Sequence, residues 1–138
     1  AGAIRDADHL KIACARDWHK LRCFAPYLVF DVCDGKALHS GTSWVNEMEA
    51  TLALLIARHM LEKYPELSPS SIGIVTPYNG QVKHIRKVFK EAFGTEKCQF
   101  DVNSVDGFQG REKDIMILSC VRSQKGNDWG GSIGFLKD

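Results

Sequence analysis

The chain has 138 residues, with 18 Lys and Arg against 17 Asp and Glu and a formal net charge of +1. Its 44% hydrophobic and 25% charged residues are typical of a globular domain, and no apolar run approaches the roughly 20 residues that span a bilayer. We therefore expect no membrane partner, and any binding of nucleic acid must depend on local rather than net charge.

Five cysteines are present, and no two of them form a C-x-x-C pair. An odd number without metal-ligand spacing argues against a disulfide framework and against a zinc site, so no metal site is predicted. Reduced thiols are typical of proteins of the cytosol or nucleus.

Residues 1–26 have only weak helical spacing and end at Pro26, which stops any preceding helix. We expect a lead-in that is partly extended or disordered, in which Trp18 and His19 pack or cap locally. The run Tyr-Leu-Val-Phe-Asp-Val at 27–32 then predicts a strand, the first element of a domain over 27–138.

A loop over residues 34–42 precedes a predicted helix, which begins at Ser43 or Asn46 and ends by Tyr64. Asn46, with Glu49 three residues later, has the shape of a capping box. Apolar spacing predicts which residues form the buried face of this helix: Met48, Leu52, Leu55, Ile56, His59 and Met60.

The run Ile-Gly-Ile-Val-Thr at 72–76 predicts a short strand. Pro77 suits the first turn of a second helix, expected over 78–93 with Thr76 as its N-cap. The polar face of this helix is basic, and we expect most of it to be solvated. It carries Lys83, Arg86, Lys87 and Lys90.

Residues 102–114 are rich in polar side chains, yet apolar runs flank them on both sides. Alternating apolar residues over 100–105 predict a strand, and the nearly unbroken apolar run at 115–121 predicts a strand buried on both faces. Gly107 and Gly110 lack a Cβ, which a sharp turn or a close approach to a ligand requires. A polar, glycine-containing segment between two strands is where α/β folds place their ligands.

This segment also resembles a known family. Ser-Val-Asp-Gly-Phe-Gln-Gly-Arg-Glu-Lys-Asp at 104–114, followed by Ile-Leu-Ser-Cys-Val-Arg at 117–122, resembles motif V of superfamily 1 helicases, in the branch of senataxin and the nonsense-mediated-decay helicase. Gly-Ile-Val-Thr-Pro-Tyr-Asn-Gly-Gln at 73–81 resembles motif IV of the same helicases. The stretches at 18–21 and 25–27 resemble the lead-in to the second motor domain of senataxin-like helicases and favour the senataxin side, and the stretch at 133–136 also matches the branch.

The resemblance implies that residues 27–138 are the second RecA-like domain of a two-domain motor, cut before an Arg-rich motif VI. Its fold would be α/β, of the P-loop NTPase type, with a mostly parallel sheet and flanking helices. The alternation of predicted strands and helices independently favours an α/β fold with a mostly parallel sheet.

The resemblance also assigns candidate site residues. Nucleotide-facing positions are Gly110, Arg111 and Glu112, with the Glu112 carboxylate toward the ribose. Two residues, Asp106 and Gln109, would couple the nucleotide to the nucleic acid. The positions that would face a nucleic-acid strand are Thr76, Pro77, Tyr78, Gln81 and Ser104. From the residues alone, Glu112 could instead form a surface ion pair with Lys113 or Arg111, although the match of the whole motif favours the ligand, and the Ser104 hydroxyl could stabilise a turn. Phe108 is expected in the core, and Arg122 as a brace.

In this family ATP binds between two RecA-like domains, so the first such domain of the same chain is an implied partner. That domain would hold most of the Mg²⁺ ligands and the phosphate loop. The other partner would be single-stranded RNA or DNA, or an RNA–DNA hybrid, along which the motor would move 5′ to 3′. The expected location is the nucleus or the cytoplasm, with the nucleus favoured. The 138 residues contain no G-x-x-x-x-G-K-[ST] loop, so we expect them to be monomeric and catalytically inactive alone.

Two alternatives remain open at this point. One is a nucleic-acid-binding or docking domain without ATPase activity. The other is a Rossmann-like or flavodoxin-like small-molecule binder, which would need a glycine-rich turn after the first strand, where the sequence offers only Asp-Gly-Lys at 34–36.

Overall fold

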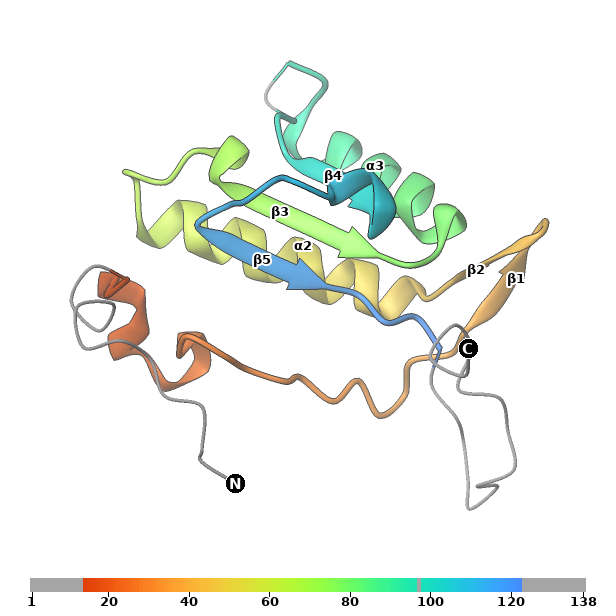
Figure 1. The fold of residues 1–138 in the computed structure, drawn as a ribbon, viewed down its shortest axis with the longest axis horizontal. Coiled ribbons are helices and arrows are strands. Elements are labelled where there is room, and N and C mark those ends of the chain that lie inside the picture. The colour runs from red at the N-terminus through yellow and green to blue at the C-terminus, as the bar shows by residue number, and fades with distance from the viewer. Residues whose placement is uncertain (1–13, 97, 123–138) are drawn as a thin grey trace. The chain divides into compact units, whose positions relative to one another are not determined.

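A computed structural model describes residues 14–96 and 98–122 of the chain (Figure 1). The chain divides into two compact units, Ala1–Asp31 and Val32–Asp138. The start of the predicted lead-in, the glycine-rich loop after residue 122 and the matching stretch at 133–136 lie outside the described residues.

The described part of the first unit contains two short 3-10 turns, η1 (Asp17–Lys20) and η2 (Arg22–Phe24). Trp18 is buried and meets His19 edge-on, with 5.9 Å between ring centroids. The Arg16 backbone N–H donates to His19 Nδ1 at 3.3 Å. Local packing and capping by Trp18 and His19 is therefore confirmed.

The strand predicted at residues 27–32 is wrong, because this run has no regular secondary structure. Tyr27 is 85% exposed and Val29 is 78% exposed. An extended run becomes a strand only when a neighbour takes up its backbone hydrogen bonds, and among the described residues no strand pairs with this one.

The second unit is built on a parallel sheet of order β4–β3–β5 (Figure 1). Its strands are β3 (Ile72–Thr76), β4 (Asp101–Ser104) and β5 (Ile115–Leu118). All five residues of β3 are buried, as expected for a central strand. The α/β fold with a parallel sheet is thus confirmed.

A β-hairpin overlaps the loop predicted over residues 34–42 and extends to Val45, so part of that loop prediction is wrong and the predicted helix cannot begin at Ser43. Strands β1 (Leu38–Ser40) and β2 (Ser43–Val45) pair antiparallel. Gly41 between them has φ +60°, a conformation that favours glycine. The sequence pattern did not predict this hairpin. Both strands are short, contain polar side chains and show no clear alternation of apolar and polar residues.

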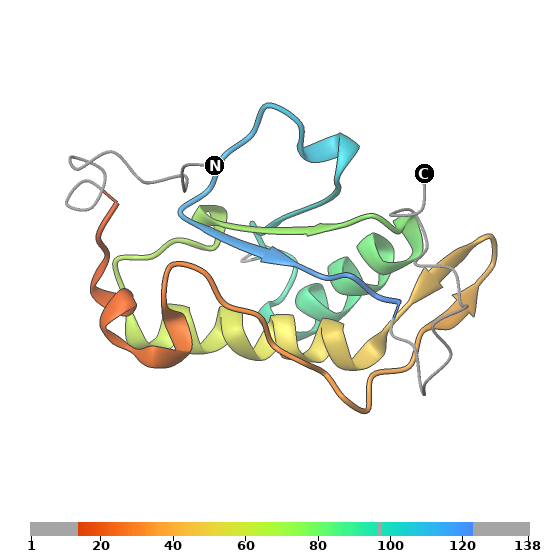
Figure 2. The same ribbon diagram turned by 60° about the horizontal axis from the view of Figure 1, so that its bottom comes forward.

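Two helices, α2 (Glu47–Lys63) and α3 (Asn79–Phe93), lie against one face of this sheet (Figure 2). Ile72, Ile74 and Val102 meet the helices in the core. Phe89 of α3 is fully buried and packs edge-on against Phe100, with centroids 4.8 Å apart. Tyr78, rather than the predicted Thr76, is the N-cap of α3. No described helix has the length and apolar character needed to cross a membrane.

The buried face of α2 differs from the predicted one. Apart from Met60, the helix buries small side chains, which let it approach the sheet closely; they are Ala50, Ala53 and Ala57. Met48 and Leu55 are 47% and 46% exposed, and His59 is exposed. Apolar residues occur around much of this helix, so spacing alone could not identify the side that packs.

The predicted burial of β5 on both faces is also wrong. Ile115 and Ile117 pack against the core, whereas Met116 is 49% and Leu118 is 63% exposed. In the described part of the chain, β5 is an edge strand, and α2 and α3 cover only the face to which the two isoleucines point.

Candidate functional site

Four of the predicted nucleic-acid residues meet where two parallel strands end. Thr76 and Ser104 are the last residues of β3 and β4 and are directly paired in register. Pro77 and Tyr78 follow at once and are half-buried. The structure therefore gathers these four residues at the carboxyl edge of the sheet, the usual ligand position in parallel α/β folds.

Local hydrogen bonds shape this carboxyl edge. The Tyr78 N–H donates to Thr76 Oγ1 at 3.4 Å, and the Gly107 N–H donates to Ser104 Oγ at 3.1 Å. Ser104 thus stabilises the turn that opens the next segment, as one of its two sequence interpretations stated. Its hydroxyl is half-buried and retains further hydrogen-bonding capacity.

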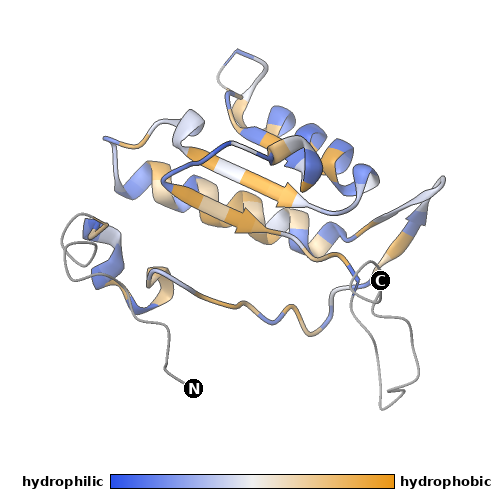
Figure 3. Cartoon of the chain, viewed as in Figure 1, coloured by the Kyte–Doolittle hydropathy of each residue, from blue (hydrophilic) through white to orange (hydrophobic). Residues whose placement is uncertain are grey.

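The segment 105–114 then crosses the sheet face opposite the two helices (Figure 2). It leaves β4 at the carboxyl edge and must enter β5 at the other edge, because β5 begins beside Ile72, the first residue of β3. A 3-10 turn, η4 (Asp106–Phe108), begins the crossing. Figure 3 shows the segment after this turn as mostly hydrophilic, against hydrophobic β3 and β5.

Phe108 anchors the crossing segment to the sheet. Its side chain is 7% exposed, so the predicted core position is confirmed. A Cβ on Gly73 would lie 2.7 Å from Phe108 Cζ and 2.9 Å from Met116 Sδ, so β3 needs a glycine beneath the ring. The predicted coupling residues, Asp106 and Gln109, flank Phe108 and are both exposed.

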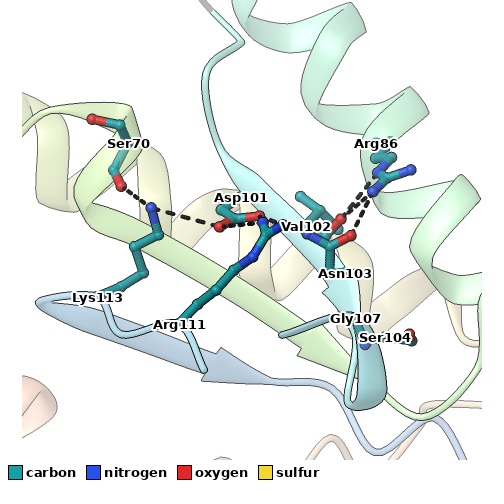
Figure 4. Close-up of polar contacts among 9 residues, drawn as sticks. All are labelled: Ser70, Arg86, Asp101, Val102, Asn103, Ser104, Gly107, Arg111 and Lys113. Carbon is teal, nitrogen blue, oxygen red and sulfur yellow. Dashed lines mark hydrogen bonds and ion pairs between the residues drawn. The ribbon is translucent and has the colours of Figure 1, made fainter. Parts of the chain in front are cut away.

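The carboxylate of Asp101, at the start of β4, lies beside the positively charged side chains of this segment (Figure 4). Its side chain is only 16% exposed. Arg111 donates from one guanidinium nitrogen to both carboxylate oxygens, at 3.1 and 3.2 Å, and Asn103 Nδ2 donates at 2.6 Å. Lys113 Nζ lies 3.6 Å away and also donates to the Ser70 carbonyl at 2.9 Å.

A second arginine secures the same strand from α3. Arg86 donates to the Val102 carbonyl from two nitrogens, at 3.0 and 2.6 Å, and to Asn103 Oδ1 at 2.9 Å (Figure 4). Arg86 is therefore not simply part of a solvated basic face. Spacing along the chain did not indicate these roles, since Arg86 bonds to residues 16 and 17 positions away and Asp101 to Arg111, 10 positions away.

The arrangement around Asp101 leaves Glu112 available. Arg111 and Lys113, its neighbours in sequence, are both directed to Asp101 rather than to Glu112. Glu112 is exposed and has no hydrogen bond or ion pair within the described ranges 14–96 and 98–122. Gly110 has φ +76°, which a residue with a Cβ would adopt only with strain. Residues 110–112 thus form an exposed turn with one unpaired carboxylate.

Two of the predicted nucleic-acid residues, Thr76 and Gln81, are fully buried, and the Gln81 side chain is bonded entirely within the domain. Its Oε1 accepts from the Asn46 N–H at 2.9 Å, and its Nε2 donates to the Asn46 carbonyl and to Ser119 Oγ, both at 3.0 Å. While these bonds persist, the Gln81 amide cannot reach a nucleic-acid strand directly.

The fit of ATP and Mg²⁺ can be judged from the side chains present. An exposed carboxylate such as Glu112 can accept hydrogen bonds from the two hydroxyls of a ribose. The described residues hold no group of three His, Cys, Asp or Glu side chains that could bind a metal ion. The Glu112 carboxylate therefore suits the sugar of a nucleotide. No chemical step that involves Mg²⁺ is assigned to the described residues.

Comparisons with known proteins match this description. A family model described as an AAA domain matches residues 1–138. The chain is 47% identical over 142 residues to the probable helicase MAGATAMA 3 of Arabidopsis thaliana, covering 99% of this chain and 17% of that protein. It is 35% identical to helicase SEN1 of Saccharomyces cerevisiae, covering 99% of this chain and 6% of that protein. It is 41% identical to the probable helicase senataxin of Homo sapiens, covering 91% and 4%. The chain thus spans less than a fifth of the length of each relative.

Proposed function

We propose, since the chain belongs to the AAA-domain family and to its senataxin-like superfamily 1 helicases, that it forms part of the second RecA-like motor domain of an ATP-dependent helicase. The observation that supports this most is the path of residues 105–114. They connect the carboxyl edge of the sheet, with Thr76 and Ser104, to the exposed Glu112 near the other edge.

On the nucleotide side, the exposed turn at Gly110, Arg111 and Glu112 would face ATP held mainly by a first RecA-like domain. Glu112 would accept hydrogen bonds from the ribose hydroxyls. Arg111 is paired with Asp101, so its first role would be to hold the turn rather than to contact phosphate. Mg²⁺, when bound with ATP, would neutralise phosphate charge and would be held mainly by the first domain.

On the nucleic-acid side, a single strand of RNA or DNA, or the strand of a hybrid, would lie along the carboxyl edge. The half-buried residues Pro77, Tyr78 and Ser104 would offer a hydroxyl, an aromatic ring and backbone groups there, while the fully buried Thr76 would shape the edge through its bond to the Tyr78 N–H. Such groups bind phosphate, sugar and base faces with little base readout. Gln81 would support this edge from inside, because its amide is spent on the Asn46 backbone and Ser119.

Between the two sides, Asp106 and Gln109 would transmit changes along the exposed part of the crossing segment. ATP binding would close the two motor domains and hydrolysis would release them, so the grip on the strand would alternate. Movement along the strand, 5′ to 3′ as in this branch, would follow. A nucleic-acid-binding domain without ATPase activity is the competing function, and it requires only the carboxyl edge.

The nucleotide assignment is tested by Glu112→Ala in the full-length protein. We expect a higher KM for ATP, because the ribose hydroxyls lose their acceptor. Glu96→Ala is the matched control, since Glu96 is an exposed carboxylate in the loop after α3. Equal KM values for wild type and Glu112→Ala would remove Glu112 from the site. Absence of any ATPase activity in the wild-type protein would favour the non-catalytic alternative.

The coupling assignment is tested by Gln109→Ala. We expect a smaller stimulation of ATP hydrolysis by single-stranded RNA or DNA, measured as the ratio of rates with and without the strand. Thr95→Ala, at another exposed loop position, is the control. An unchanged ratio would show that Gln109 does not connect the two sides.

A further inference from the structure

A carboxylate outside the motif segments, Glu49, connects the start of α2 to the chain that leaves β5. The predicted capping box forms only in part: Asn46 Oδ1 accepts from the Glu49 N–H at 3.2 Å, but Gln81 takes the Asn46 N–H that Glu49 would bond in a complete box. The Glu49 carboxylate is therefore free for other donors. Its Oε2 accepts from Ser119 Oγ at 2.6 Å and from the Val121 N–H at 2.9 Å.

The backbone at Val121 is strained. Val121 has φ +68° and is the only residue other than glycine with positive φ among the described residues. The Arg122 N–H donates to the Cys120 carbonyl at 2.8 Å, which closes a γ-turn around Val121. A γ-turn with positive φ is rare, and a β-branched residue adopts positive φ only at a cost. Such strain persists only where the surroundings fix it.

The N-terminal cap of α2 supplies those surroundings. Glu49 holds the N–H of Val121, and Asn46 Nδ2 donates to the Val121 carbonyl at 3.1 Å. Both peptide groups of the strained residue are thus bonded to one helix end, more than 70 residues away in sequence. Val121 itself is fully buried. The turn directs Arg122 over the Trp44 ring, with its guanidinium carbon 5.0 Å from the ring centroid.

We propose that Glu49 is a positioning residue that holds the strained turn at Val121 and thereby ties the chain after β5 to the first turn of α3. The link to α3 is Ser119, whose hydroxyl donates to Glu49 and accepts from Gln81 Nε2. Gln81 lies three residues after Tyr78, the last of the carboxyl-edge residues Thr76, Pro77 and Tyr78. The inference rests on the proposed function: a displacement of that edge by a nucleic-acid strand would be passed through Gln81 and Ser119 to Glu49.

The chemistry of the network requires an ionised carboxylate at position 49. Three donors converge on it: Ser119 Oγ–H, the Val121 N–H and Asn46 Nδ2–H, the last at 3.1 Å. A glutamine can present only one oxygen, so either orientation of its amide directs an NH₂ group at a donor. Glu49→Gln therefore breaks the link with little change in side-chain volume.

Hydrogen exchange tests the positioning directly. In the full-length protein, Glu49→Gln should raise the exchange rate of the peptide containing residues 119–122 by about tenfold or more, because the Val121 N–H loses a charged acceptor. Glu47→Gln is the matched control, since Glu47 is an exposed carboxylate in the same helical turn. Unchanged exchange in Glu49→Gln would overturn the proposal. If exchange rose throughout the domain, Ser119→Ala would replace it as the milder variant, with the same expectation at 121.

Activity tests the consequence. Glu49→Gln should lower the stimulation of ATP hydrolysis by a single-stranded oligonucleotide severalfold, with a KM for ATP within about twofold of wild type, because Glu112 is not in the network. Glu47→Gln should retain full stimulation. Equal stimulation in both variants would overturn the coupling role. A wild-type protein that hydrolyses no ATP would instead contradict the proposed function, whatever the exchange data show.

Discussion

The carboxylate of Asp101 determines which charged residues of the crossing segment remain available to a ligand. It accepts hydrogen bonds from Arg111 and forms an ion pair with Lys113, so both candidate partners of Glu112 are engaged elsewhere. The pair with Arg111 is partly exposed and adds little stability by itself. Its consequence is geometric, because it fixes the residues on both sides of Glu112 and leaves that side chain exposed.

Cys120 offers a test of the charge on Glu49. Burial is the larger cause that raises the pKa of the Cys120 thiol, and the Glu49 carboxylate raises it further. A raised pKa means less thiolate at a given pH, so Glu49→Gln should lower the pKa and speed alkylation by iodoacetamide at pH 8. The gain should be partial, because burial, the larger cause of the raised pKa, remains in the variant.

The measurement for Cys120 is its alkylation rate against pH, followed by peptide mass. The rate profile of Glu49→Gln should shift to lower pH, whereas that of Glu47→Gln should match wild type. An identical profile in Glu49→Gln and wild type would mean that the carboxylate at position 49 does not face the thiol.

The buried face of helix α2 can be tested by mutation. Spacing placed Met60 and Leu55 on one buried face, but Met60 is 1% and Leu55 is 46% exposed. Met60→Ala should therefore cost about 2 to 5 kcal/mol of stability, by loss of burial and creation of a cavity. Leu55→Ala should cost about 1 kcal/mol or less. Urea denaturation of the two variants separates these values, and equal losses would favour the face predicted from spacing.

The sequence predicted those elements whose signals are local. The strand at 72–76 and the helix at 78–93 were correct because an apolar run and an amphipathic repeat each specify one element. The run at 27–32 failed because a strand also needs a partner edge. The face of α2 failed because small alanines pack closer than the larger residues that dominate the pattern.

The candidate site, like the fold, could be predicted from the sequence only in part. Family resemblance indicated which segments matter, and the paired ends of β3 and β4 bring four of the named residues together. It could not show that the Gln81 amide is already bonded inside the domain or that Arg111 is held by Asp101. Those contacts join residues 10 to 38 positions apart, and only the folded chain determines them.

At the scale of the whole second unit, the two faces of the sheet have different tasks. One face packs on α2 and α3 and supplies the core, while the other carries the exposed segment 105–114 over Gly73 (Figure 2). The segment is held to this face by the buried Phe108 and by the polar contacts of Arg111 and Lys113 with Asp101, while Asp106, Gln109 and Glu112 remain exposed. That separation suits a segment that responds to ligands.

The 138 residues by themselves should not hydrolyse ATP. They include the exposed turn at 110–112 but no G-x-x-x-x-G-K-[ST] sequence, the phosphate-binding loop of P-loop ATPases. We expect the 138-residue chain to release no phosphate from ATP above background, with or without single-stranded RNA, while the full-length protein does so under the same conditions. Glu112→Ala in the full-length protein provides the intermediate case, a motor with a weakened nucleotide contact. The expectation that ATP hydrolysis requires both motor domains would be contradicted if the purified 138-residue chain hydrolysed ATP and Glu112→Ala within it lowered that activity.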